Sequence, residues 1–225
     1  MMNQFLLPVY SVVFGVLLAT VTKPKKHLNT KLLLSFSGAF LLALTLFELL
    51  PEVYHHLDTK LTGLFIMSGI LLQIILELFS KGAEHGHVHV HKNSTAFPWF
   101  LFISLCIHSF LEGFPIHEHN DMVYGVLIHK MPIATLVTMF LLQSDYNKLQ
   151  IATFLVVFAA MTPLGTLISN NAGIAPEYIH IINAVVIGIF FHISTTILFE
   201  SGDGHKFNLS KFVAIILGVG IAYII

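Results

Sequence analysis

Two histidines and a glutamate stand out because they occur inside apolar stretches of the sequence. His108 and Glu112 are four residues apart in LCIHSFLEGFPI, so on a helix both side chains lie on one face, about one turn apart. His129 occurs in the next apolar stretch, at a depth close to that of Glu112. Imidazole nitrogens and carboxylate oxygens are ligands of Zn²⁺ and similar first-row ions. We therefore predict a metal site formed by His108, Glu112 and His129.

Lys130 directly follows His129 and would affect how strongly such a site binds a metal. A cation beside a proposed cation site weakens metal binding by repulsion unless it is paired. We predict that the ammonium of Lys130 lies against Glu112; the alternative is that its side chain snorkels to the outer membrane interface. A purely structural interpretation also stands, in which His108 and Glu112 only lock two helices together. Pro115 withholds an N–H from the carbonyl of Leu111, which we expect to be free.

The elements that position these residues are predicted to be membrane-spanning helices. Of the 225 residues, 56% are hydrophobic and only 10% are charged, and a soluble domain of this length needs more charge to cover its surface. A helix that crosses the bilayer needs roughly 20 apolar residues. We predict an all-α polytopic membrane protein, one transmembrane domain over residues 1–225 with eight helices. The predicted segments are Phe5–Thr22, Lys31–Leu50, Leu61–Ser80, Phe97–Ile116, Met122–Leu142, Ile151–Ser169, Tyr178–Phe199 and Ser210–Ile225.

The lysines predict how these segments are oriented. At the ends of the segments and between them, every lysine except Lys60 falls in the first, third, fifth or seventh loop. The positive-inside rule then places these loops in the cytoplasm and both termini outside it. The third loop, residues 81–93, is rich in histidine, and alternating imidazoles can chelate a metal weakly; the alternative is a spacer with incidental histidines. These histidines are His85, His87, His89 and His91.

Other polar residues in or near the spans are predicted to line a path for the ion. Glu48 and Glu52 share a helix face at the outer end of the second segment, where they would collect cations. Glu77 lies near the cytoplasmic end of the third segment. His192 and Glu200 lie at mid-depth and at the inner end of the seventh. The alternatives are a polar helix terminus for the glutamates and a carbonyl-bonded structural histidine for His192.

At these residues the chain resembles the ZIP (Zrt-/Irt-like) family of divalent metal transporters. The family's fourth helix carries His-[Ser/Asn]-x-x-[Glu/Asp]-Gly, matched here by His108, Ser109, Glu112 and Gly113. Its fifth helix carries His-Glu-x-Pro-His-Glu, from which this chain departs because Lys130 replaces the first carboxylate. The resemblance implies a ZIP-like bundle of eight helices with both termini extracytoplasmic. It also implies one metal at the central site, where the family builds a two-metal centre.

The predicted function is transport of a divalent transition metal into the cytoplasm, with Zn²⁺ favoured and Fe²⁺, Mn²⁺ and Cd²⁺ as alternatives. The sequence has no phosphate-binding glycine-rich loop, so transport is expected to follow a gradient or a coupled ion. The chain is predicted not to be an enzyme. Two other functions stay open: an intramembrane metal-dependent hydrolase with Glu112 as its base, and a metal-binding sensor that does not transport.

The expected partners are the metal ion as substrate and the lipid bilayer. A homodimer is the assembly considered, and the oligomeric state is left open. The formal net charge of −1 argues against nucleic acid, because phosphate binding needs a basic field. The expected location is a bacterial inner (plasma) membrane.

Overall fold

In a computed structural model, the described residues are 2–21, 27–80, 97–117, 121–200 and 209–225, and their regular elements are all helical. The histidine-rich loop predicted at residues 81–93, with His85, His87, His89 and His91, lies outside the described residues. The helices are α1 (Met2–Val21), α2 (His27–Leu44), η1 (Thr45–Leu49), α3 (Leu50–His56), α4 (Thr59–Ser80), α5 (Trp99–Leu111), η3 (Pro115–His117), α6 (Met122–Gln143), α7 (Lys148–Asn171), α8 (Pro176–Glu200) and α9 (Leu209–Ile224).

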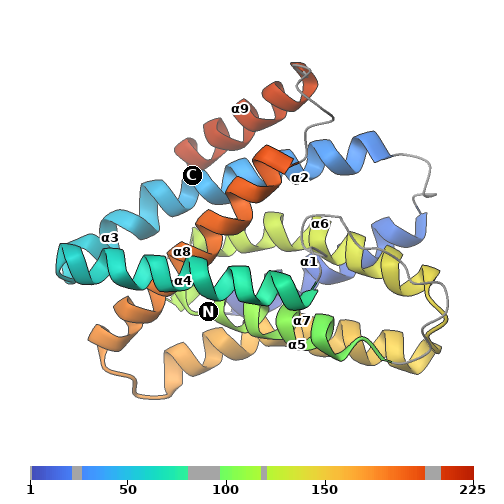
Figure 1. Cartoon of the computed structure of the whole chain (residues 1–225), viewed down its shortest axis with the longest axis horizontal. Helices are drawn as coiled ribbons and strands as arrows, with labels where there is room; N and C mark the ends of the chain where they lie inside the picture. The colour runs from blue at the N-terminus through green and yellow to red at the C-terminus, as the bar shows by residue number, and fades with distance from the viewer. Residues whose placement is uncertain (1, 22–26, 81–96, 118–120, 201–208) are drawn as a thin grey trace.

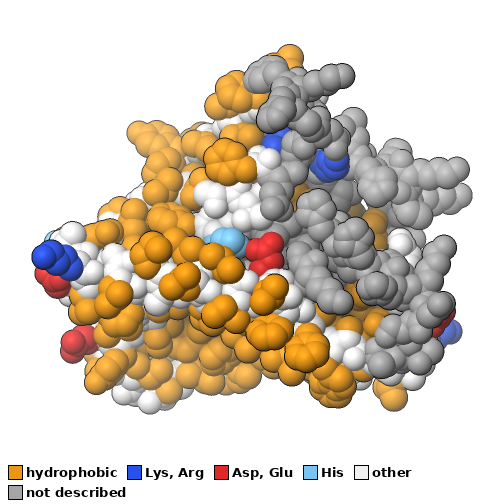
Figure 2. All heavy atoms as spheres, in the orientation of Figure 1, with side chains coloured by type: hydrophobic (Ala, Val, Ile, Leu, Met, Phe, Trp, Pro, Cys, Tyr) orange, Lys and Arg blue, Asp and Glu red, His pale blue; other side chains and the backbone are white. Residues whose placement is uncertain are grey.

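Six helical stretches in the described part of the chain are long and apolar enough to cross a membrane. They are α1, the continuous stretch Lys31–His56, α4, α6, α7 and α8, and the shorter apolar helices α5 and α9 coincide with the fourth and eighth predicted segments. The visible described surface is mostly hydrophobic, as expected of a lipid-facing bundle (Figure 2). The prediction of an all-α polytopic membrane protein is confirmed. The extracytoplasmic placement of both termini stays a prediction.

The helices pack into one bundle, in which most of them contact at least two others. α1 packs against α6 and α7, α4 against α8 and α5, and α9 lies along α2 on the outside of the bundle (Figure 1). The chain at and just after the end of α5 approaches α7 to backbone contact at a pair of glycines. A Cβ on Gly113 would lie 2.3 Å from the carbonyl oxygen of Thr162, and one on Gly165 would lie 2.1 Å from that of Phe110. Larger side chains there would therefore push α5 and α7 apart.

α5 ends at Leu111, before the predicted end of the fourth segment at residue 116. The N–H of Glu112 still donates to the carbonyl of His108, at 3.0 Å, so the last helical turn keeps both side chains on one face. The chain then tightens, and the N–H of Phe114 donates to the carbonyl of Leu111 at 3.1 Å. The expectation that this carbonyl is free was wrong. The tighter turn ahead of Pro115 supplies the donor that the proline lacks.

The second segment contains a short π-helix, η1, directly before α3. Pro51 lacks an N–H and its ring clashes with a preceding carbonyl, and a local π-turn is one adjustment that relieves such a conflict in a membrane helix. Glu48 lies in η1 and is exposed, whereas Glu52 lies one turn later in α3 and is half-buried. The predicted pair of glutamates therefore does not present two equivalent carboxylates.

Candidate metal centre

The three residues predicted as metal ligands lie together inside the bundle. His108 and Glu112 come from the end of α5 and His129 from α6, and none of them is more than 1% exposed. Nε2 of His108 lies 3.3 Å from Oε2 of Glu112, as the four-residue spacing predicts. The rings of His108 and His129 meet edge to face, with centroids 6.1 Å apart. The structure thus brings the predicted residues together, and their role as ligands stays a prediction.

Lys130 reaches into this cluster from α6. Its ammonium forms an ion pair with Oε1 of Glu112 and donates to the hydroxyl of Ser109. It also lies 4.4 Å from the ring centroid of Phe158, a cation–π contact. Because Lys130 is only 1% exposed, the snorkelling alternative was wrong and the predicted pairing with Glu112 is confirmed.

Thr162 on α7 completes the cluster and was not predicted. Its hydroxyl lies 2.7 Å from Oε1 of Glu112 and accepts a hydrogen bond from Lys130 at 2.7 Å. The same hydroxyl lies 2.9 Å from the carbonyl oxygen of Ser109, so its one proton serves either acceptor. The only hint in the sequence is a hydroxyl residue directly before Pro163 in an apolar segment. Which helix it faces depends on tertiary packing.

A second cluster lies between α3 and α8. Nε2 of His56 lies 2.8 Å from Oε1 of Glu52, and the ring of His56 stacks on that of His180, with centroids 4.2 Å apart. Within the part of the chain that the structure describes, only Glu52, His56 and His180 form a group of three potential ligands with donor atoms all within 4.8 Å of one another. Sequence reasoning placed Glu52 at the outer mouth but missed His180, because nothing local indicates that the second and seventh segments are neighbours.

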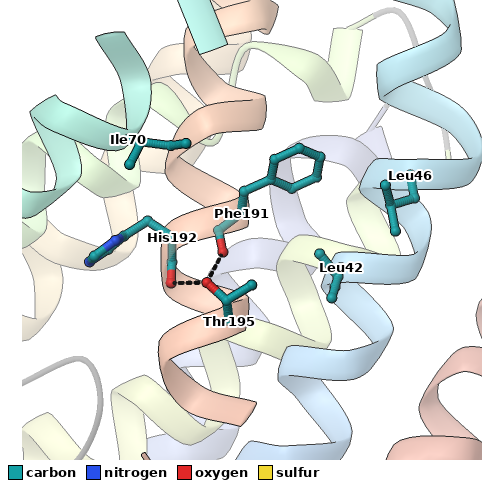
Figure 3. A pocket seen from close by; sticks show the side chains of 6 residues that line it. All are labelled: Leu42, Leu46, Ile70, Phe191, His192 and Thr195. Atoms are coloured by element: carbon teal, nitrogen blue, oxygen red, sulfur yellow. Dashed lines mark hydrogen bonds between the residues drawn. The ribbon is translucent and has the colours of Figure 1, made fainter. Parts of the chain in front are cut away.

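Glu77 and His192, predicted separately as path residues, contact each other. Oε2 of Glu77 on α4 lies 2.6 Å from Nε2 of His192 on α8, and both side chains are partly exposed. His192 also lines a largely apolar pocket, and Figure 3 shows its ring pointing away from Leu42 and Leu46. Glu200 is the last residue of α8. The structure therefore joins two of the predicted path residues into a pair.

Comparison with known proteins gives the family. A family model described as ZIP zinc transporter matches residues 80–225. The chain belongs to the ZIP zinc transporter family. Zinc transporter ZIP1 of Plasmodium falciparum is 30% identical over 163 residues, which are 65% of this chain and 46% of that protein. Zinc transporter ZIP1 of Danio rerio is 33% identical over 88 residues, which are 36% of this chain and 29% of that protein. The chain thus spans less than half the length of these relatives.

Membership of the ZIP family confirms the resemblance stated from the sequence. The family consists of transporters and not of enzymes, in agreement with the prediction that the chain is not an enzyme. An integral membrane location agrees with both the family and the apolar helices.

The donor set at the centre of this ZIP-family chain suits a divalent metal as substrate. Oε1 of Glu112 is engaged by Lys130 and Thr162, which leaves Oε2 facing His108. Together with His129, these groups offer two nitrogens and one oxygen, a combination that first-row ions accept. The three donors are not all within 4.8 Å of one another, unlike those of the second cluster. Side-chain movement would therefore have to close the central set around an ion.

Proposed function

We propose that this ZIP-family chain carries a divalent transition metal, Zn²⁺ foremost, across the membrane into the cytoplasm through His108, Glu112 and His129. The observation that supports it most is a buried cluster of ionisable residues in the middle of a bundle of apolar helices. Charged and titratable side chains are costly in such a setting and mark ion pathways. Zinc is favoured by the description of the family, and Fe²⁺, Mn²⁺ and Cd²⁺ are competitors for the same donors.

The centre is proposed to hold one ion at a time. The ammonium of Lys130 already brings a positive charge to Oε1 of Glu112. A second divalent ion at that oxygen would meet repulsion in a poorly screened interior, since both partners are only 1% exposed. A single ion bound by Oε2 of Glu112 and the imidazoles of His108 and His129 would leave the Lys130–Glu112 ion pair intact.

The proposed route begins outside the cell and ends in the cytoplasm. Glu48 and Glu52 attract the ion at the outer mouth, and the central ligands take it over. The Glu77–His192 pair then lies on the way to Glu200 and to the histidines of the 81–93 loop. This direction depends on the orientation predicted from the lysines.

One alternative function draws support from a specific observation. Lys130 stands where a carboxylate ligand was expected and pairs with Glu112, and this loss of a ligand favours a metal-binding sensor that does not transport. A hydrolase needs Glu112 as a general base, and the same pair with Thr162 occupies one of its oxygens. The measurement of flux decides between transport and binding alone.

The test is uptake of radiolabelled zinc by proteoliposomes containing the purified chain. His108→Ala is expected to lower uptake by at least the roughly 10- to 100-fold that loss of a supporting group costs a metal site. Ile107→Ala is the matched control, because this neighbour on α5 is 39% exposed and lies outside the cluster. Equal uptake by His108→Ala and Ile107→Ala would end the transport proposal. Tight zinc binding by the unsubstituted chain without uptake would favour the sensor.

Two finer expectations are also proposals. Homodimer formation is measured by mass determination in detergent or nanodiscs. A bacterial inner membrane was expected from the sequence, whereas the relatives compared above come from eukaryotes and give that expectation no support. Fractionation of the source cells, with detection of the chain, decides which membrane carries it.

A further inference from the structure

The Glu52–His56–His180 cluster joins two helices that are far apart in the sequence. Glu52 and His56 share one face of α3, and His180 lies in the first turns of α8. Figure 1 shows α3 and the start of α8 at the same end of the bundle, and the two helices contact each other. All three donor atoms lie within 4.8 Å of one another. We infer that this cluster is a metal-binding site of its own, for a divalent ion that accepts two imidazoles and a carboxylate.

The exposure of the three side chains suits an ion that arrives from water. His56 is 44% exposed and Glu52 is 34% exposed, whereas His180 is only 8% exposed. One ligand is thus fixed by the bundle, and two are presented at its surface. An ion can reach the cluster without any change in helix packing. The carboxylate supplies the charge that attracts the ion. The imidazoles supply nitrogen donors, which Zn²⁺ and Co²⁺ bind more readily than Mg²⁺ or Ca²⁺ do.

The stacked rings indicate how the ligands would close around the ion. The planes of His56 and His180 differ by only 14°, so both ring nitrogens cannot point at one ion without a rotation. The ring of His56 has room to rotate because it lies at the end of α3 and is exposed. Glu52 lies one turn earlier, at 2.8 Å from His56, and follows with a small side-chain change. The three donor groups therefore already lie close together, but the imidazole rings must still rotate before their nitrogens point at one ion.

This cluster is separate from the central site. It uses α3 and α8, whereas the central residues come from α5, α6 and α7, and the two share no residue. Among the described residues, Glu52 pairs with His56, whereas the central Glu112 pairs with Lys130. Binding there is an equilibrium property. It does not depend on the proposed transport and can hold if transport fails.

A titration with Co²⁺ alone tests the inference in the full chain. Because the histidines of the 81–93 loop are also predicted to bind metal, the background variant carries His85→Asn, His87→Asn, His89→Asn and His91→Asn. His56→Ala and His180→Ala are compared with His55→Ala, the matched control, since His55 is the exposed neighbour of His56 but is not one of the three ligands. Co²⁺ bound to nitrogen and oxygen ligands is followed by its visible absorption, and equilibrium dialysis counts the bound ions. Helical circular dichroism verifies that each variant is folded.

His56→Ala and His180→Ala are each expected to lose the Co²⁺ bound at the outer cluster, or to bind it at least about tenfold more weakly. His55→Ala and His108→Ala are expected to keep this outer Co²⁺. If His180→Ala does not fold, His56→Ala carries the test, because its exposed side chain can be removed without opening the core. Unchanged stoichiometry and affinity in folded His56→Ala would overturn the inference. Loss of all Co²⁺ binding in His108→Ala, with the outer residues intact, would also overturn it. A loss of zinc uptake in His108→Ala alone bears on the transport proposal and leaves this site untouched.

Discussion

The central and outer clusters are built from the same parts and differ in their surroundings. Each has a histidine and a glutamate four residues apart near the end of a helix, plus a histidine from another helix. The central pair is 1% exposed, whereas the outer pair is 34–44% exposed. Burial makes an unpaired carboxylate costly, and the central one is paired with Lys130. The same four-residue spacing therefore has different consequences. The outer donors are accessible to an ion from water, whereas the central carboxylate already pairs with the ammonium of Lys130.

The largest effect is expected from Lys130→Ala, which leaves Glu112 buried without its partner. Removing one member of a buried ion pair costs about 3–5 kcal/mol of folding stability. Thermal unfolding in detergent measures the loss. The double variant Glu112→Gln/Lys130→Met is the control and should recover much of it, because no charge remains buried.

Thermal unfolding of Lys130→Ala with added zinc tests whether the ammonium of Lys130 competes with the metal. If the ammonium of Lys130 stands in for a cation, Zn²⁺ should stabilise Lys130→Ala more than the unsubstituted chain, because ligand binding to the folded state raises its stability. Equal stabilisation of both proteins would show that the ammonium does not compete with the metal. An unchanged unfolding temperature in Lys130→Ala without metal would contradict the buried pair itself.

Thr162→Val tests the hydroxyl that supports the central carboxylate. Hydrogen bonds to charged groups contribute about 1.5–3 kcal/mol, and that is the expected loss of stability. Thr166→Val is the matched control one turn later on α7, where the hydroxyl donates to the neutral carbonyl of Gly113 at 2.8 Å. Its expected loss is about 0.5–1.5 kcal/mol. Equal losses in the two variants would show that the contact to Glu112 has no special weight.

Gly165→Ala is expected to push α5 and α7 apart and so to disturb the central site but not the outer cluster. The added Cβ would lie 2.1 Å from the carbonyl oxygen of Phe110, and overpacking of this kind costs about 1–3 kcal/mol. Zinc uptake should fall, while Co²⁺ binding by the outer cluster is unchanged. Gly63→Ala on α4 is the control, since its Cβ meets nothing within 4 Å. A loss of outer binding in Gly165→Ala would show that the two clusters are coupled.

Glu52→Gln is expected to change stability least. An ion pair four residues apart on a helix surface contributes about 0.3–0.5 kcal/mol, and the Glu52–His56 pair is partly exposed, so the unfolding temperature should hardly shift. Co²⁺ binding at the outer cluster should weaken, and acid should weaken it in the unsubstituted chain, because metal and protons compete for the same donors. If Glu52→Gln were destabilised as much as Lys130→Ala, the outer cluster would instead serve to hold α3 and α8 together.

Local spacing and hydropathy were enough to predict much of this molecule. The His108–Glu112 face follows from helical periodicity, and the pairing of Lys130 with Glu112 follows from the cost of an unpaired buried charge. Thr162 and His180 could not be predicted as partners, because their roles depend on which helices are neighbours. A four-residue spacing is visible in one segment, whereas a contact between α3 and α8 is a property of the folded bundle.

The ends of helices were the least predictable part of the fold. The chain leaves the α-helix before Pro115 through a tighter turn, and it accommodates Pro51 through the π-helix η1. A proline in the sequence indicates that a helical hydrogen bond is lost, but the nearby backbone decides how the carbonyl is satisfied. The carbonyl of Leu111 shows this, since the N–H of Phe114 reaches it.

A crystal structure of the chain grown with Zn²⁺ or Cd²⁺ would show how many ions the central site holds, because anomalous scattering locates each ion. One ion is expected between His108, His129 and Oε2 of Glu112, with Lys130 still paired with Oε1. Two ions at the centre with Lys130 displaced from Glu112, or no ion there at all, would contradict this expectation.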